Sequence, residues 1–289
     1  MTALRQRMRE DMQLRGLAER TQESYLAAVR QLALQYGTSP DQLSEEEIRQ
    51  YFLHLRNEKR LAPNTINVAL NAVKFLYTYT LQRPWPFHDL IRPHLPQKLP
   101  VVLSPDEVWQ VLEQIRRPSY RVCLSVIASC GLRLLEGVQL QVPQIDSARM
   151  QLHIRAGKGA KDRAIPLPPR TLALLRAHWC THRNSVWLFP SPGSMGDDRA
   201  TATRPMDESG VQKAFRRAVQ EVGLHKPASV HSLRHSWATH LLESGVSVRV
   251  LQLWMGHASP TTTAIYTHLT QHAEQTAAAA LERLTAGLP

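Results

Sequence analysis

Apolar residues in the first third of the chain recur at helical spacing. Leu26, Val29 and Ala33 stand three or four residues apart, and the same spacing continues in the two segments that follow. A glycine stop, a Ser-Glu-Glu-Glu capping box and an initial proline supply boundaries for these segments. The predicted helices cover residues 21–36, 44–59 and 63–77. With the basic lead that precedes them, they predict a small all-helical N-terminal domain over residues 1–82.

A proline-rich stretch separates this domain from the rest of the chain. Its prolines are Pro84, Pro86, Pro93, Pro96 and Pro100. Because proline lacks an amide donor and fixes its backbone, few residues here sustain a helix or a sheet. We therefore predict an extended, semi-rigid linker over residues 83–102 and a second domain over residues 103–289.

The second domain combines helical spacing with one strand pattern. Met150, Leu152 and Ile154 alternate with polar residues, and Ile165 and Leu167 do so after a Gly- and Lys-rich turn. This alternation predicts a β-hairpin with its tip at residues 157–162. Helical spacing predicts further helices at about 104–115, 120–129, 172–179 and 210–222. The predicted fold class is mainly α with a small β-hairpin, an α+β domain joined to a helical bundle.

Three short helices predicted after residue 229 gather polar side chains. The first carries His231 and Arg234 on one face near its first turn, where the helix dipole favours an anion. A second ends just before His257, and Ser259-Pro260 starts a third that carries Tyr266. The ends of these helices are able to meet at one site.

Composition indicates the class of partner. Lys and Arg number 35 against 24 Asp and Glu, and the resulting net charge of +11 favours a polyanion. The three cysteines have no C-x-x-C spacing, which favours free thiols in a reducing cytoplasm over a disulfide framework or a zinc site. No apolar run reaches transmembrane length, and the charged start is unlike a secretory signal. We expect a soluble, intracellular protein.

Five short motifs occur in a fixed order along the second domain. They are Gly131-Leu132-Arg133 with Glu136, the Gly-Lys-Gly-Ala-Lys-Asp-Arg run at 157–163, His231-Ser232-Leu233-Arg234-His235, Gly256-His257, and Tyr266. In this order they resemble the tyrosine recombinase (phage integrase) family, with Xer-like and integron-integrase-like features. The motifs fall between Leu103 and Thr270, and the preceding helical region also fits. The resemblance implies a two-domain DNA clamp, made of a SAM-like core-binding bundle and a catalytic domain with a C-terminal helix.

The resemblance also implies DNA cleavage and rejoining through a 3′-phosphotyrosine, with Tyr266 as the nucleophile. The planar fork of arginine binds two phosphate oxygens and stays protonated, so Arg133 and Arg234 are the candidates for the phosphate clamp. Neither ATP nor a metal cofactor is expected. The other candidates are Lys158 as the acid for the 5′-oxygen, His231 and His257 for phosphate contact or proton transfer, and Glu136 as the residue that orients Arg133.

DNA contacts are predicted on both domains. The candidates are Arg20, Lys59, Arg60, Asn64, Asn67 and Lys74 in the first domain and Lys161 and Arg163 in the hairpin. Solvated helix surface explains each first-domain residue equally well. The family implies a homotetramer on double-stranded DNA with an inverted-repeat site, in which a C-terminal helix near residues 271–284 exchanges between protomers. The expected location is the cytoplasm, in association with the nucleoid and without a membrane partner.

Other interpretations remain for single residues and for the whole chain. His231 and His235 stand four residues apart, as two metal ligands on one helix do, although no third ligand is evident. Tyr266, taken by itself, is typical of an aromatic residue in a hydrophobic core. Trp254-Met255 stands where relatives commonly have two leucines. Integron-type recognition of folded single strands would require an extra helical insertion, and none is obvious between Arg163 and His231. We favour an integrase or transposase of a mobile element. The alternatives are a Xer-type dimer resolvase, a type IB topoisomerase-like enzyme and a non-catalytic DNA-binding regulator.

Overall fold

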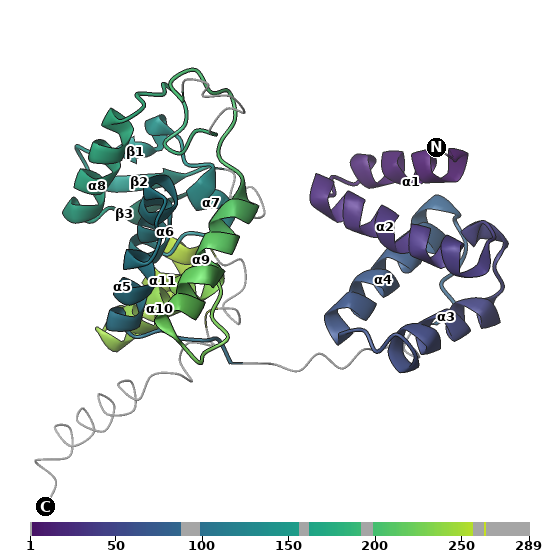
Figure 1. Cartoon of the computed structure of the whole chain (residues 1–289). Coiled ribbons are helices and arrows are strands. Elements are labelled where there is room, and N and C mark those ends of the chain that lie inside the picture. Colours follow the sequence, from purple (N-terminus) through teal and green to yellow (C-terminus); the bar gives the residue numbers. More distant parts are fainter. Residues whose placement is uncertain (1, 88–98, 156–161, 192–198, 257–262, 264–289) are drawn as a thin grey trace, which may run out of the picture. The chain divides into compact units, whose positions relative to one another are not determined.

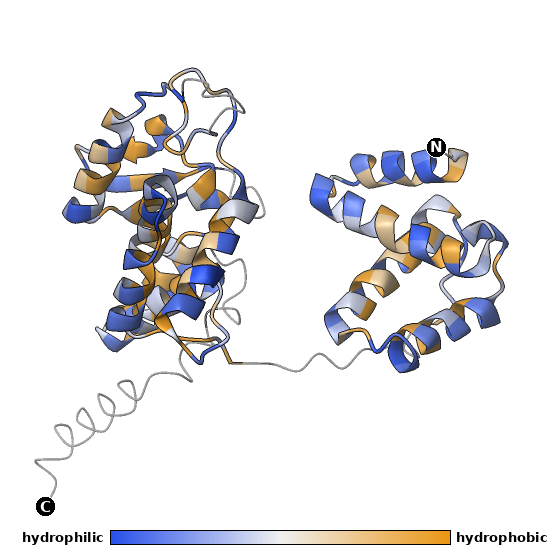
Figure 2. Cartoon of the chain, in the orientation of Figure 1, coloured by the Kyte–Doolittle hydropathy of each residue, from blue (hydrophilic) through white to orange (hydrophobic). Residues whose placement is uncertain are grey.

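The computed structural model describes residues 2–87, 99–155, 162–191, 199–256 and 263 (Figure 1). Within them the chain is mostly helical with one three-stranded sheet, which confirms the predicted fold class. The chain divides into two compact units, Met1–Lys98 and Leu99–Pro289, and each has its own apolar core. Figure 2 colours each residue by hydropathy and shows hydrophilic and hydrophobic residues alternating along the helices of each unit. Among the described helices, none combines the length and the apolar character needed to cross a bilayer.

The first unit is a helical bundle. Gly37 ends its second helix with φ at 63°, and Ser44 and Glu47 complete the predicted capping box of the third. Proline at the start of the fourth helix stands where the missing amide proton costs nothing. The elements are α1 (Ala3–Leu14), α2 (Glu19–Tyr36), a 3-10 turn (Pro40–Gln42), α3 (Glu45–Asn57), α4 (Pro63–Phe75) and a π-helical turn (Leu76–Thr80).

The first and last residues of this bundle are more ordered than the residue pattern predicts. The basic lead forms α1, and Met8 and Met12 on its inner face are buried in the core. Leu4, Met8 and Met12 stand four residues apart, so the helical signal was present in the sequence. Trp85 and Phe87, which fall within the predicted linker, are also buried there, with ring centroids 5.2 Å apart. Residues 88–98 of that linker lie outside the described residues.

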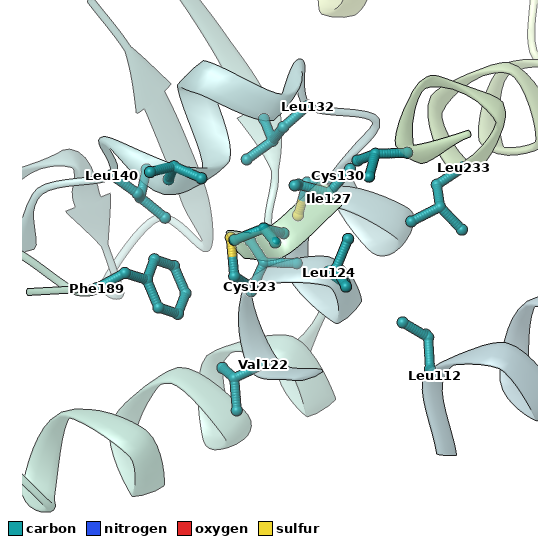
Figure 3. Packing of buried hydrophobic residues seen from close by; sticks show 14 of the residues in the cluster. Leu112, Val122, Cys123, Leu124, Ile127, Cys130, Leu132, Leu140, Phe189 and Leu233 are labelled. Carbon is teal, nitrogen blue, oxygen red and sulfur yellow. The ribbon is translucent and has the colours of Figure 1, made fainter. Parts of the chain in front are cut away.

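The second unit is organised around α6, which packs against α5, α7, α8, α9 and α10. Side chains on several faces of α6 are therefore buried, among them Leu124 and Ile127. Figure 3 shows both residues between Leu112 of α5, Leu233 of α10 and Phe189. The helices are α5 (Pro105–Glu113), α6 (Pro118–Cys130), α7 (Leu134–Val138), α8 (Pro169–Cys180), α9 (Glu208–Val222), α10 (Val230–Glu243) and α11 (Val248–Met255).

The sheet of the second unit contains the predicted hairpin. Strands β1 (Ile145–Asp146), β2 (Gln151–Ile154) and β3 (Arg163–Pro166) pair antiparallel in the order β1-β2-β3, and a 3-10 turn at Val142–Gln144 precedes them. Leu152 pairs with Ile165, and both face the core. Strand β3 also contacts α11, which brings the hairpin strand beside the end of that helix. Residues 156–161 at the hairpin tip lie outside the described residues.

Candidate active site

Glu136 is the acceptor at the centre of three arginines. Its carboxylate accepts hydrogen bonds from Nη1 of Arg133 (2.8 Å) and from Nη1 and Nη2 of Arg163 (3.0 and 2.7 Å). Nη1 of Arg234 lies 3.9 Å from the same carboxylate. Arg133 immediately precedes α7, Arg163 opens β3 and Arg234 lies in α10. The fold therefore brings three distant parts of the sequence together, and three cations around one carboxylate leave an excess of positive charge.

The C-terminal end of α11 supplies further acceptors for the same arginines. Carbonyls in the last turn of a helix have no partner within it and carry partial negative charge. Here the three successive carbonyls of residues 254–256 each bind a different arginine. The pairs are Arg163 Nε with Trp254 (2.7 Å), Arg234 Nη2 with Met255 (2.5 Å) and Arg133 Nη2 with Gly256 (3.3 Å).

The turn that leads into Arg133 is held against α10. Nη1 of Arg234 donates to the carbonyl of Gly131 (2.6 Å), and Nε1 of Trp237 donates to the carbonyl of Ser129 (3.0 Å). Gly131 has φ of 62°, and a Cβ there would lie 2.2 Å from the Trp237 ring. Glycine meets both the backbone and the space requirement. This packing fixes the start of the segment that carries Arg133.

The cluster runs from the interior to the surface. The side chain of Arg234 is 1% exposed, that of Arg163 6% and that of Arg133 23%. His231, in the first turn of α10, is exposed. The accessible edge of the cluster therefore presents a guanidinium and an imidazole, the two kinds of donor that suit a phosphate group.

The charges of the cluster set its protonation states. Burial opposes ionisation of Glu136, but the hydrogen bonds and charge of Arg163, with Arg133, lower its pKa to about 2. Burial and the nearby charges of His231 and Arg234 lower the pKa of His235 to about 4. Partial removal from water, then Arg234 and Arg133, lower the pKa of His231, although Glu136 opposes this. These influences favour the uncharged imidazole of His231, the form that is able to accept a proton.

A cavity of about 380 Å³ adjoins His231. It lies beside α9 and the start of α10, and its polar lining comes from Gln212 and Arg216 of α9 together with Ser229 and His231. The helix was predicted from the sequence, but Gln212 and Arg216 were not among the predicted site residues. The signal available was the exposed basic pair Arg216 and Arg217 on its polar face. A hollow with a cation and an amide beside the cluster suits a polyanion larger than one phosphate.

Four predicted site residues lie outside the described residues. They are Lys158, Lys161, His257 and Tyr266. The predicted C-terminal helix at 271–284 also lies outside them. Of the six predicted catalytic residues, the structure thus describes Arg133, His231 and Arg234, and it brings these three together with Glu136.

The DNA-contact candidates of the first unit lie on its surface. Arg20, Lys59, Arg60, Asn64 and Lys74 are exposed and Asn67 is half-buried. Within α4 the spacing of residues 64, 67 and 74 places them on one stripe. Lys59 and Arg60 belong to the connection that leads into α4. These contacts stay predictions.

Arg163 and the His231–His235 pair have local surroundings that bear on their predicted roles. The guanidinium of Arg163 is turned inward, where it binds Glu136 and the carbonyl of Trp254, and only 6% of the side chain is exposed. Its predicted DNA contact stays a prediction. The rings of His231 and His235 meet edge to face, with centroids 4.6 Å apart. Within the described ranges no group of three or more His, Cys, Asp or Glu side chains is arranged to hold a metal ion.

Similarity to known proteins covers both units. The phage integrase family matches residues 102–273, and the phage integrase N-terminal SAM-like domain matches residues 4–87. A Sinorhizobium fredii protein named as an integrase/recombinase is 45% identical over 92% of this chain and 84% of its own. A crystal structure of XerA recombinase is 28% identical, with a TM-score of 0.51 over 99% of this chain and 98% of that chain. An integrase of transposon Tn1549 in complex with transposon right-end DNA shares the fold, with a TM-score of 0.71, 20% identity, and coverage of 98% and 100%.

Proposed function

Because the chain belongs to the phage integrase family of tyrosine recombinases, we propose that its arginine cluster is the site at which DNA strands are cut and rejoined. The protein is a site-specific DNA recombinase, an enzyme that cleaves and reseals DNA. The observation that carries the assignment of the site is the meeting of Arg133 and Arg234 at one carboxylate and one helix end, beside an exposed imidazole.

Arg133 and Arg234 neutralise the charge that builds on the non-bridging oxygens of the scissile phosphate. Both guanidiniums are held by protein acceptors before DNA arrives, so little reorganisation is required when the transition state forms. Removing one such donor costs about 10²- to 10³-fold in rate. Glu136 orients Arg133, since it binds both its side chain and its main-chain amide (2.8 Å each).

Tyr266 supplies the nucleophile in this proposal. Its phenolic oxygen forms a bond to phosphorus as the bond to the 5′-oxygen breaks, which leaves a 3′-phosphotyrosine and a free 5′-hydroxyl. Lys158 gives the proton that the 5′-oxygen requires, and neutral His231, with His257, contacts the phosphate or takes the tyrosine proton. These assignments rest on the positions of the residues in the family motifs. The reverse reaction reseals the strand without ATP.

The wider setting of the reaction belongs to the same proposal. The basic first unit closes on double-stranded DNA at an inverted-repeat site, with α4 and the residues just before it against the backbone. Four protomers exchange strands in pairs through a Holliday junction, linked by their C-terminal helices. The likeness to an integrase/recombinase over most of the chain supports work on a mobile element. The location in this proposal is the cytoplasm, at the nucleoid.

Trapping of the covalent intermediate tests the proposal. On a nicked duplex that loses the 5′-hydroxyl fragment after cleavage, the wild-type protein should accumulate a protein–DNA adduct. Tyr266→Phe, which lacks only the hydroxyl, should form none while DNA binding stays within severalfold, and Arg234→Ala should lose cleavage as well. Adduct formation by Tyr266→Phe at the wild-type rate would refute the assignment of the nucleophile.

A further inference from the structure

The guanidinium of Arg163 makes three hydrogen bonds inside the second unit. Nη1 and Nη2 bind the two oxygens of Glu136 as a bidentate pair (3.0 and 2.7 Å), and Nε binds the carbonyl of Trp254 (2.7 Å). Only 6% of the side chain is exposed. A DNA phosphate would have to replace these bonds, so the position of Arg163 suits an internal role.

We propose that Arg163 is a positioning residue that fixes the end of α11 against Glu136 and thereby sets the geometry of the phosphate clamp. The inference rests on the proposed function, because a clamp exists only if Arg133 and Arg234 act on phosphate. Arg163 itself does not touch DNA in this account. It acts through Glu136 and through the backbone of the last turn of α11.

The end of α11 is the part of the fold that both clamp arginines share. The carbonyl of Met255 binds Arg234 and that of Gly256 binds Arg133, directly after the carbonyl that Arg163 holds. A movement of this short segment would shift both guanidiniums at once. His257, the next residue in the chain, follows the segment directly.

Arg163 also binds the carboxylate of Glu136, which would otherwise compete with a DNA phosphate for Arg133 and Arg234. Because it takes both oxygens of Glu136, the side chain of Arg133 binds Oε1 alone. Without Arg163 the buried charge of Glu136 would have to be balanced by Arg133 and Arg234. Both guanidiniums would then be drawn toward Glu136 and away from a bound phosphate.

The same side chain ties the lysine hairpin to the cluster. Arg163 is the first residue of β3, and it pairs with Ile154, the last residue of β2. The tip between them carries Lys158. Gly256 passes so close that a Cβ there would lie 3.0 Å from Cδ of Arg163. One residue thus joins the base of the hairpin, Glu136 and the end of α11.

This arrangement requires arginine because of the shape of the guanidinium group. Its planar fork reaches a carboxylate and a carbonyl at the same time, whereas the ammonium group of lysine is a point charge without that geometry. Arg163→Lys therefore keeps the charge and removes the positioning. The matched control is Arg149→Lys, the same change at a side chain that is 79% exposed and pairs with Asp146 at the edge of the same sheet.

Three measurements on the full-length variants separate the possible roles: the rate of adduct formation on a nicked duplex at saturating DNA, the dissociation constant for that duplex, and the salt dependence of binding. We expect Arg163→Lys to slow the adduct step on the order of 10²-fold, as a misplacement of about 1 Å does, with binding within threefold and an unchanged salt slope. Arg149→Lys should match the wild type in all three.

The inference is overturned if Arg163→Lys reacts at the wild-type rate on saturating DNA. It is also overturned if the adduct step keeps its wild-type rate at saturating DNA and only binding weakens, because that is the behaviour of a DNA contact. Should Arg163→Lys fail to fold, Arg163→Met combined with Glu136→Gln removes both charges and is compared with Glu136→Gln alone. A further slowing of the adduct step supports the inference, and an equal rate overturns it. Tyr266→Phe, measured in parallel, separates the two proposals, since an adduct there contradicts the nucleophile whatever Arg163 does.

Discussion

Replacement of Glu136 by glutamine should make the second unit less stable at neutral pH and less sensitive to acid. The side chain of Glu136 is 10% exposed, and its pKa is about 2 against an ordinary value of 4.5. That difference corresponds to about 3 kcal/mol of folding stability. Because the pKa in the folded protein is the lower one, this stabilisation is complete above pH about 5 and is lost as the pH falls through 4.5 toward 2.

The glutamine variant lacks this titration, so the free energies of unfolding of the two proteins should converge in acid. We expect a difference of about 3 kcal/mol at pH 7 that shrinks by about 1.5 kcal/mol at pH 3.5. Urea unfolding followed by tryptophan fluorescence measures it, since five of the six tryptophans belong to residues 99–289.

Glu221→Gln is the matched control. Glu221 also lies between two arginines, Arg116 (3.1 Å) and Arg217 (2.8 Å), but its side chain is 28% exposed. Solvent screens such a pair, so its replacement should cost under about 1 kcal/mol. If Glu136→Gln and Glu221→Gln are equally mild at pH 7, or if the Glu136 difference does not change with pH, the ion cluster does not stabilise the site as described.

Two further predictions concern the turn before Arg133 and the surface of the first unit. Gly131→Ala should destabilise the protein by about 3 kcal/mol in urea unfolding and slow cleavage, because its Cβ would lie 2.2 Å from the Trp237 ring. The control is Gly223→Ala, where φ is 74° and nothing lies within 4 Å of the added Cβ. This variant should cost only about 1–2 kcal/mol. Arg60→Ala should lower the slope of the log binding constant against log salt by about 0.9, because one exposed cation is lost from the DNA contacts. The rate of adduct formation at saturating DNA should stay unchanged. An unchanged slope would show that Arg60 does not contact DNA.

The sequence predicted those parts of the fold that local patterns determine. Spacing and end signals predicted the start of α10 after residue 229 and the end of α11 just before His257, and Gly245 and Gly256 follow these helices with positive φ. Alternation gave β2 and β3. The pattern missed β1, because a strand of two residues, Ile145–Asp146, has no visible period.

Contacts between distant residues were the part that spacing does not encode. Arg163 was assigned to DNA because it is a cation in a basic hairpin motif, and nothing in the motif reveals that the fold turns it onto Glu136 and Trp254. The role of the α11 carbonyls was equally invisible, since main-chain groups leave no trace in residue types. The five motifs identified Arg133 and Arg234 as members of one site. The packing of α6 against α10 explains why the two residues meet.

The nature of the DNA-linked residue tests the central claim most directly. The wild-type adduct can be trapped on a nicked duplex, digested with trypsin and nuclease, and analysed by mass spectrometry. Cleavage after Arg249 and Arg283 gives a peptide over residues 250–283 whose only tyrosine is Tyr266. We predict a nucleotide attached through its 3′-phosphate to that tyrosine. Attachment to any other residue, or through a 5′-phosphate, would contradict the account.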